Sequence, residues 1–362
     1  MPLTPLKTVF DIEPYKGGEA TLPGVAKPIK LASNENPFGC SPKAKAAAIA
    51  ALENTALYPE GRATKLREAI AMRYGLDPER IICGAGSDEI FQLLLRAYLA
   101  PGDEIVQSQY AFLMYRIFAR PMGGVVRTAK NDGMRADVDA LLAEVNEKTR
   151  IVFLDNPNNP TGTYLPFSEV RRLHAGLPDN VMLVLDAAYA EYVNRNDYSA
   201  GVELVSEFDN VVMTRTFSKI HGLASMRVGW AYAPVDVIDA LNKVRLPFNV
   251  ATAAQAAAAA AIEDQDFAEK SRRHNEAEIE RVAGAVRALG YEVTESAGNF
   301  VLVHFPLEKR RAAADADAHF RKKGFIVRAV GAYGLPGALR ISIGTVEQNT
   351  GMLAALTEFA KQ

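Results

Sequence analysis

The chain has 362 residues, of which 49% are hydrophobic and 23% are charged, a composition typical of globular proteins. Its length exceeds that of a single typical core and predicts two domains. A formal net charge of −2 provides no overall basic field, so we expect no nucleic-acid partner. The most apolar long stretch, residues 250–262, is mostly alanine and too short to span a bilayer, so we expect no membrane association.

The first 35 residues are rich in turns and prolines and are expected to form an arm that lies on other structure. Two helices follow, at residues 43–52 and 63–74, and the second is expected to end before Gly75. Apolar strands then alternate with helices; the strands are expected at residues 81–83, 104–107, 151–155, 181–186, 211–214 and 229–232. Several strands are apolar at consecutive positions, as in a sheet covered on both faces. The alternation predicts a mainly parallel α/β sheet.

Beyond residue 245 the pattern changes. Two long helices are expected first, at residues 252–263 and 267–289, and then strands at residues 291–295, 299–305, 325–328 and 339–343. This mixture predicts a smaller α+β domain, which the N-terminal arm is expected to join. The expected fold is therefore α/β, with a large domain of residues 36–245 and a small domain of residues 1–35 plus 246–362.

The two cysteines, Cys40 and Cys83, form neither a disulfide framework nor a metal-binding spacing. The five histidines form no ligand cluster, so we expect no bound metal. Residues 1–7 lack a basic head followed by an apolar core, so we expect no signal peptide. These features favour a reducing compartment and a cytoplasmic location.

The most informative residue is Lys219, which follows the predicted strand at residues 211–214 and is flanked by Phe217 and Ile220. A lysine in apolar surroundings can lose its proton and attack a carbonyl carbon, forming a Schiff base. Arg227, two turns further on, is suited to clamp an anion on the same ligand. Pyridoxal 5'-phosphate (PLP) carries both an aldehyde and a phosphate. The alternative for a lone lysine is an ordinary surface position.

A glycine-rich segment, residues 84–89, precedes the predicted helix at residues 90–98. Glycines allow a tight turn, after which the free N–H groups of Ser87 and Asp88 at a helix start favour a phosphate. Taken alone, a plain helix cap explains the segment better. Glu89 stands where a dinucleotide fingerprint has its third glycine, which argues against a dehydrogenase.

Two further segments each follow a predicted strand, where open α/β sheets collect their ligands. Asn159 precedes Pro160 in a stiff loop, and its extended backbone places a donor for a phenolate oxygen; a purely structural loop is the alternative. Asp186 ends an apolar strand and needs a partner when buried, such as the protonated pyridine nitrogen of PLP, with Tyr189 donating to the ring oxygen. The alternative for Asp186 is a helix cap.

Four weaker candidates complete the set. Tyr110 follows the strand at residues 104–107 and is either a stacking partner for a cofactor ring or a core residue. Tyr58 lies on a turn, where exposure is the ordinary outcome. Arg340 interrupts an apolar strand and must meet an anion, for which a substrate carboxylate is suitable. Arg328 is either a second such residue or a member of a structural ion pair.

These segments, in this order, resemble the fold type I PLP-dependent aminotransferases over essentially the whole chain. Within that group the chain is most similar to the histidinol-phosphate aminotransferase family. The family-like motifs are Pro14-Tyr15, Ser33 to Gly39, Tyr58-Pro59, Gly86 to Glu89, Asn158 to Gly162 and Thr216 to Lys219. Residues 224–226, before Arg227, depart from the pattern, since they are Ala-Ser-Met where Ala-Gly-Leu is commoner.

The resemblance implies a role for each matched residue. Lys219 holds the cofactor and later moves the proton, Asp186 pairs with the pyridine nitrogen, and Asn159 and Tyr189 hold the phenolate oxygen. Tyr110 stacks on the ring. The implied phosphate-binding residues are Ser87, Asp88, Thr216, Ser218 and Arg227, with Tyr58 reaching the phosphate of the partner subunit. The implied substrate-binding residues are Tyr15, Asn34, Arg328 and Arg340. A homodimer follows from the role of Tyr58.

The implied activity is PLP-dependent transamination between L-histidinol phosphate and 2-oxoglutarate in histidine biosynthesis, so the partners are a small-molecule amino donor and a 2-oxo acid. Two alternatives use the same fold: an aromatic amino acid aminotransferase, and a PLP-dependent decarboxylase of a phosphorylated amino acid. A PLP-binding regulatory module is a further alternative, but no helix-turn-helix extension or basic segment accompanies the sequence.

Overall fold

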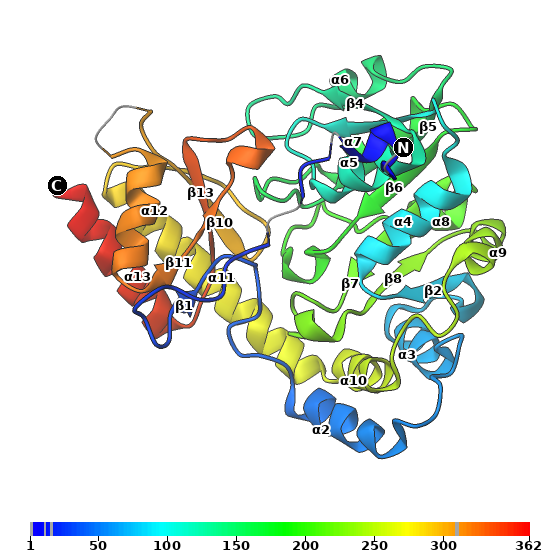
Figure 1. Cartoon of the computed structure of the whole chain (residues 1–362), viewed down its shortest axis with the longest axis horizontal. Coiled ribbons are helices and arrows are strands. Elements are labelled where there is room, and N and C mark those ends of the chain that lie inside the picture. The colour runs from blue at the N-terminus through cyan, green and yellow to red at the C-terminus, as the bar shows by residue number, and fades with distance from the viewer. Residues whose placement is uncertain (1–2, 11, 15–16, 308–310) are drawn as a thin grey trace.

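The computed structural model describes residues 3–10, 12–14, 17–307 and 311–362, and Figure 1 shows two lobes of unequal size. The large lobe contains a seven-stranded sheet with the order β2-β8-β7-β6-β5-β3-β4. Its strands are β2 (Ile81–Gly84), β3 (Glu104–Ser108), β4 (Val125–Ala129), β5 (Thr149–Asp155), β6 (Met182–Asp186), β7 (Val211–Thr216) and β8 (Gly229–Tyr232). Strand β8 runs in the direction opposite to the other six strands, which are parallel to one another, so the expected mainly parallel sheet is confirmed.

Helices cover both faces of this sheet. Helices α4 (Ser87–Tyr98), α5 (Met114–Ala119) and α9 (Val235–Val244) pack on one face. The helices on the other face are α2 (Pro42–Ala51), α3 (Thr64–Tyr74), α6 (Val138–Ala143), α7 (Phe167–Ala175), α8 (Val202–Glu207) and α10 (Thr252–Glu263). Alternate residues of each central strand therefore enter separate cores, which explains the uninterrupted apolar runs in the sequence.

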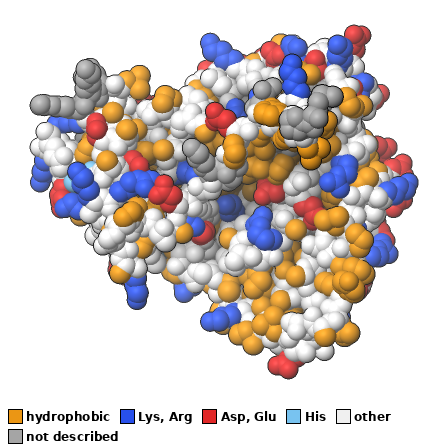
Figure 2. Space-filling model, viewed as in Figure 1, with side chains coloured by type: hydrophobic (Ala, Val, Ile, Leu, Met, Phe, Trp, Pro, Cys, Tyr) orange, Lys and Arg blue, Asp and Glu red, His pale blue; other side chains and the backbone are white. Residues whose placement is uncertain are grey.

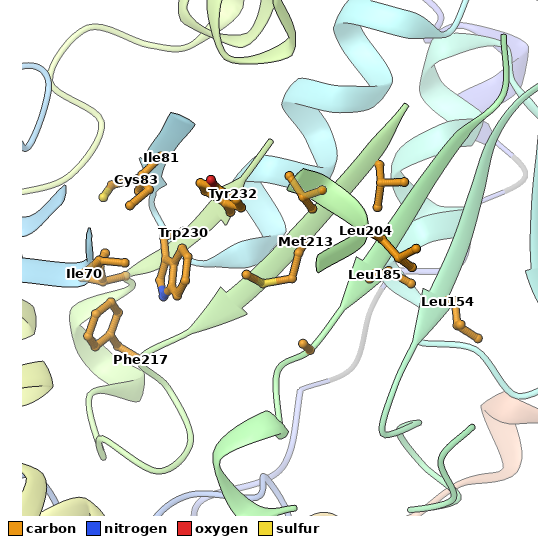
Figure 3. Close-up of a cluster of buried hydrophobic side chains, with 14 of the residues drawn as sticks. Ile70, Ile81, Cys83, Leu154, Leu185, Leu204, Met213, Phe217, Trp230 and Tyr232 are labelled. Carbon is orange, nitrogen blue, oxygen red and sulfur yellow. The ribbon is translucent and has the colours of Figure 1, made fainter. Parts of the chain in front are cut away.

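The second of these cores gathers large side chains from several strands. Figure 3 shows Trp230 of β8 between Phe217 on one side and Met213 of β7 on the other, with Ile70 of α3 next to Trp230 and Phe217. Trp230 and Phe217 are almost fully buried. Phe217 is two residues from Lys219, so this core anchors the start of the segment that carries the lysine.

The small lobe is built on a four-stranded antiparallel sheet with the order β12-β13-β10-β9. Its strands are β9 (Glu292–Thr294), β10 (Phe300–His304), β12 (Arg328–Ala329) and β13 (Ala338–Ser342), and its helices are α11 (Gln265–Ala288), α12 (Ala313–Lys322) and α13 (Val346–Ala360). Strand β1 (Ile29–Lys30) of the N-terminal segment pairs in parallel with β11 (Phe325–Ile326). The expected attachment of the arm to this lobe therefore holds for β1.

The sequence patterns did not anticipate several features, among them strand β4 and the position of helix α1. Strand β4 was missed because it lies at the sheet edge and is only partly buried, so its residues do not form an apolar run. Helix α1 (Lys7–Phe10) contacts the short 3-10 helix η3 (Arg120–Met122) of the large lobe, away from β1. The remaining 3-10 helices are η1 (Leu52–Asn54), η2 (Pro78–Arg80), η4 (Ala190–Tyr192), η5 (Ala224–Met226) and η6 (Gly331–Tyr333).

The domain division stays a prediction, and the packing of α10 bears on its second boundary. The small alanine side chains of α10 allow close contact with α2 and α3, and residues 254–262 belong to the same core as the large sheet. We therefore propose that the large domain extends to Glu263 and that the small domain resumes at α11. Among the described residues, no helix combines the length and apolar character needed to cross a membrane.

Candidate active site

The carboxyl ends of β5, β6 and β7 meet the start of α4 at a pocket of about 190 Å³. Figure 2 shows the surface hollowed between the two lobes, with acidic and basic side chains in and around the hollow. The expected cofactor-binding residues that line the pocket are Ser87, Asp88, Asn159, Asp186, Tyr189, Thr216, Ser218, Lys219 and Arg227. The structure therefore brings together residues from four segments that are distant in the sequence.

Lys219 lies in the loop after β7, as expected. Its Nζ donates a hydrogen bond to the carbonyl oxygen of Ser33 at 3.2 Å. Burial and, second, the nearby positive charge of Arg340 lower the pKa of Lys219 to about 8. An amine with such a pKa is neutral near neutral pH far more often than an ordinary lysine, and the neutral form is the one that attacks a carbonyl carbon.

Asp186 is buried at the end of β6, as its place after an apolar strand predicts. Its Oδ2 accepts a hydrogen bond from the hydroxyl of Tyr115 at 2.7 Å, and its Oδ1 accepts a longer one from Thr214 at 3.4 Å. Burial raises the pKa of Asp186 to about 6. Both partners are neutral hydroxyls, so a cationic ligand group in the pocket would stabilise the ionised carboxylate.

The start of α4 forms an anion cradle with Arg227. The Nη2 of Arg227 lies 3.4 Å from Oδ2 of Asp88, and its Nη1 donates to the hydroxyl of Ser218 at 3.3 Å. Gly86 has a φ of 84°, and a Cβ there would lie 2.3 Å from Nη2 of Arg227, so only glycine permits this approach. A helix start, a guanidinium and hydroxyl groups together suit a phosphate.

A hydrogen-bond network joins the pocket to the small lobe. Asn34, which has a φ of 56°, donates from Nδ2 to the hydroxyl of Tyr189 at 2.8 Å. Arg340 on β13 is buried; its Nη1 donates to Oδ1 of Asn159 and its Nη2 to the carbonyl oxygen of Ala32 at 2.7 Å. Residues of the N-terminal segment, the large lobe and the small lobe therefore meet beside Lys219.

Arg328 lies opposite Arg340 in the register of β12 and β13, and its side chain is half-buried. Cross-strand neighbours project to the same face of a sheet. Two guanidinium groups on the same face of the sheet can bind one anionic group together. Tyr15, the fourth expected substrate residue besides Asn34 and these arginines, lies outside the described residues.

The structure places Tyr110 outside the set of residues that line the pocket. Strand β3 continues to Ser108, and the turn that follows carries Phe112 rather than Tyr110 to the pocket wall. Tyr110 is half-buried and packs against an apolar cluster that includes Leu113 and Tyr333. Tyr58 also lies away from the pocket: its side chain is 82% exposed and its ring stacks on Phe248, with 4.7 Å between ring centroids.

Sequence reasoning also missed a second buried carboxyl group in the pocket, Asp155. Its Oδ2 accepts hydrogen bonds from Nδ2 of Asn158 at 2.9 Å and from the backbone N–H of Asn159 at 3.1 Å. Burial raises the pKa of Asp155 to about 7, and the neighbouring Asp186 contributes to the increase. The signal was present, because Asp155 ends an apolar strand just as Asp186 does.

The side chains that line the pocket match the reactive groups of PLP in their chemistry. Lys219 supplies an amine of lowered pKa for the aldehyde, and Asp186 supplies a buried carboxylate for the protonated ring nitrogen. The helix start and Arg227 supply a cradle for the phosphate. Within the described ranges, no group of three or more His, Cys, Asp or Glu side chains is placed to hold a metal ion.

Comparison with known proteins also points to a PLP-dependent enzyme. The model of the aminotransferase class I and II family matches residues 26–356. Histidinol-phosphate aminotransferase of Maricaulis maris (strain MCS10) is 54% identical over 361 residues, 100% of both chains, and that of Rhodopseudomonas palustris (strain HaA2) is 52% identical over 356 residues, 98% of both chains. The chain belongs to the class I and II aminotransferases, in the histidinol-phosphate aminotransferase family.

A solved structure supports the fold and the cofactor of this aminotransferase. Histidinol-phosphate aminotransferase from Sinorhizobium meliloti, in complex with pyridoxal-5'-phosphate, aligns with a TM-score of 0.90 and 27% identity, covering 99% of this chain and 98% of that one. The expected fold type I and the PLP dependence of the aminotransferase are thereby confirmed.

One glycine of the aminotransferase holds the lysine loop against the N-terminal segment, and its replacement is predicted to destabilise the fold. Gly222 has a φ of 66°, and a Cβ there would lie 1.8 Å from the carbonyl oxygen of Gly39. We expect Gly222→Ala to lower the free energy of unfolding by about 2–4 kcal/mol, measured by urea denaturation.

Gly284→Ala is the matched control for this prediction. Gly284 lies on α11 with nothing within 4 Å of an added Cβ. Alanine there should stabilise the protein by up to about 1 kcal/mol through helix propensity alone. Equal stabilities for the two variants would contradict the close approach of the two loops.

Proposed function

We propose that this aminotransferase catalyses transamination between L-histidinol phosphate and 2-oxoglutarate, in histidine biosynthesis. The observation that carries the proposal is the 54% identity, over the whole chain, to a protein named histidinol-phosphate aminotransferase. The pocket supports it in chemical terms, because it combines an amine of lowered pKa, a buried carboxylate and an anion cradle.

We propose the following roles for the residues around the cofactor. PLP, when bound, supplies an electron-withdrawing ring that stabilises negative charge at the α-carbon of the substrate. Lys219 binds the cofactor through Nζ and, when released, moves a proton at that carbon. Asp186 holds the ring nitrogen in its protonated form, and Asn159 and Tyr189 hold the ring oxygen. Phe112 takes the stacking position that was expected for Tyr110, because it lines the pocket.

The proposed phosphate-binding residues surround the start of α4. Both Ser87 and Asp88 contribute their backbone N–H groups, because they occupy the first turn of the helix. Thr216 and Ser218 contribute hydroxyls, and Arg227 contributes its guanidinium. Burial raises the pKa of Asp88, and the positive charges of Arg227 and Lys219 act in the opposite direction.

Arg340 and Arg328 are proposed to select the substrate. One amino donor is a phosphate monoester, whereas glutamate carries a side-chain carboxylate, so one pocket must accept either anion. A guanidinium binds both groups through parallel N–H donors. Asn34 lies beside Tyr189 and so borders the same space. Tyr15 keeps its proposed substrate-binding role on the basis of the family resemblance alone.

The test is a substrate comparison with the purified protein. Each amino donor is supplied with 2-oxoglutarate, and glutamate formation is measured with L-histidinol phosphate, L-histidinol, phenylalanine and tyrosine. We expect kcat/KM for histidinol phosphate to exceed that for each of the others by on the order of 10²-fold, because the others leave the arginines without the phosphate.

Histidinol is the matched control, since it lacks only the phosphate. Equal rates with histidinol phosphate and phenylalanine would contradict the proposal and favour an aromatic amino acid aminotransferase. Release of carbon dioxide from a phosphorylated amino acid, without glutamate formation, would contradict it in favour of a decarboxylase.

We further propose a homodimer. Large apolar side chains are exposed on a continuous part of the large lobe around α2 and α3: Ile49, Leu52, Leu57, Tyr58, Met72, Leu246 and Phe248. An exposed apolar surface of this kind is typical of a protein–protein interface. A partner subunit bound there would cover Tyr58 and let it reach the partner's phosphate site. A cytoplasmic location is also proposed; Cys40 and Cys83 are both free thiols, as a reducing compartment permits.

A further inference from the structure

The carboxylate of Asp186 accepts a hydrogen bond from Tyr115, a residue that has no role in the proposed function so far. Tyr115 lies on α5, 71 residues before Asp186 in the chain, and its hydroxyl donates to Oδ2 of Asp186 at 2.7 Å. The side chain of Tyr115 has an exposed fraction of 0%. A hydrogen bond to an ionised acceptor is stronger than one between neutral groups, and more so where water is excluded.

Aromatic neighbours fix the ring of Tyr115. It stacks on Phe153 of β5, with 4.5 Å between centroids and 10° between planes. Phe91 of α4 and Phe112 contact it edge-on, at 5.1 Å and 5.8 Å between centroids. The hydroxyl therefore cannot leave Asp186 without disturbing three packed rings, one of which also lines the cofactor pocket.

The hydrogen bond from Tyr115 affects the pKa of Asp186, which burial and neighbouring charges also change. Burial raises the pKa of Asp186, the negative charge of Asp88 on α4 raises it further, and Asp155 faces it from β5. The hydroxyls of Tyr115 and Thr214 on β7 act in the opposite direction. Burial and the adjacent carboxylates raise the pKa of Tyr115 well above its ordinary value, so it remains a donor throughout the working range of pH.

We propose that Tyr115 is a positioning residue for the reaction: its hydroxyl fixes the Asp186 carboxylate in the ionised form and orientation that pair with the ring nitrogen of the cofactor. The inference rests on the role of Asp186 given under the proposed function. In this proposal Tyr115 makes no contact with the substrate. The predicted effect is therefore on PLP binding, and it does not depend on which amino donor the enzyme uses.

The test is Tyr115→Phe, which removes one hydroxyl and keeps the three ring contacts. PLP is titrated into the apoprotein, and its Kd is measured by absorbance from pH 5 to 9. We expect Kd near pH 7 to rise by on the order of tenfold. Removing the hydrogen bond raises the pKa of Asp186, so the loss of binding on acidification should begin at a higher pH than in the unsubstituted protein.

Two controls separate positioning from a purely structural role. Tyr291→Phe removes a hydroxyl that has no hydrogen-bond partner among the described residues, and it should leave Kd and its pH dependence unchanged. Asp186→Asn combined with Tyr115→Phe should bind PLP no more weakly than Asp186→Asn alone, because the hydroxyl then has no carboxylate to fix.

The proposal is overturned if Tyr115→Phe lowers only the thermal unfolding temperature of the apoprotein and leaves Kd unchanged. It is equally overturned if the full loss of affinity persists in the Asp186→Asn background. Because PLP binding is measured without an amino donor, neither result depends on which substrate the enzyme uses. A failure of the histidinol phosphate assignment is therefore distinguishable from a failure of this inference.

Discussion

Lys219→Ala is expected to abolish transamination, with a fall in kcat on the order of 10⁴-fold or more, because one amine supplies both the covalent attachment and the proton transfer. The pKa of Lys219, about 8, leaves part of the amine neutral at working pH. Among the residues that the structure describes, no other lysine lines the pocket. Single-turnover kinetics with histidinol phosphate measure the fall directly.

Mass spectrometry gives a second measurement for the same variant. After incubation with PLP and reduction with borohydride, the unsubstituted protein should gain the reduced cofactor at position 219, whereas the variant should gain none there. Lys243→Ala, on the exposed side of α9, is the control and should retain both the adduct and the activity. An adduct on another lysine together with undiminished turnover would refute the assignment of Lys219.

The fold was predictable where a short pattern determines the structure. Consecutive apolar residues at 151–155 and 211–214 identified the central strands, because both faces of those strands are covered by helices. Edge strand β4 could not be found in this way, because most of its residues are exposed or only partly buried and do not form an apolar run. The sequence placed α10 at the right residues but assigned it to the small domain, whereas α10 packs against α2 and α3 of the large lobe. Alanine-rich helices can pack against many surfaces, so the residue types do not identify the neighbour.

The site residues that could be predicted from the sequence are those that lie just after a buried strand. Lys219 and Asp186 were found because each lies just after a buried strand. The sequence analysis did not identify Phe112, which lines the pocket, because the direction of a side chain on a turn depends on turn geometry, which the residue types do not encode. Tyr115 was not found, because its partner is 71 residues away and no local spacing joins them.

Asp186→Asn is expected to weaken catalysis by on the order of 10²- to 10³-fold in kcat and to raise the Kd for PLP as well. Asparagine preserves the shape of the side chain and can still accept the hydrogen bond from Tyr115. It removes the negative charge, so the protonated ring nitrogen would be left in a buried site without its counter-ion. Both quantities are measured on the purified variant, by steady-state kinetics and by titration of the apoprotein.

Asp155→Asn is the decisive comparison, because Asp155 lies opposite Asp186 in the register of β5 and β6 and lines the same pocket. Its raised pKa, about 7, means that much of it is already neutral near neutral pH, and its hydrogen bonds go to the loop that carries Asn159. We therefore expect its substitution to cost less than about tenfold in kcat. If the two variants are equally impaired, the pairing with the ring nitrogen cannot be assigned to Asp186 alone. The cofactor would then require the charge that the two adjacent carboxyl groups share.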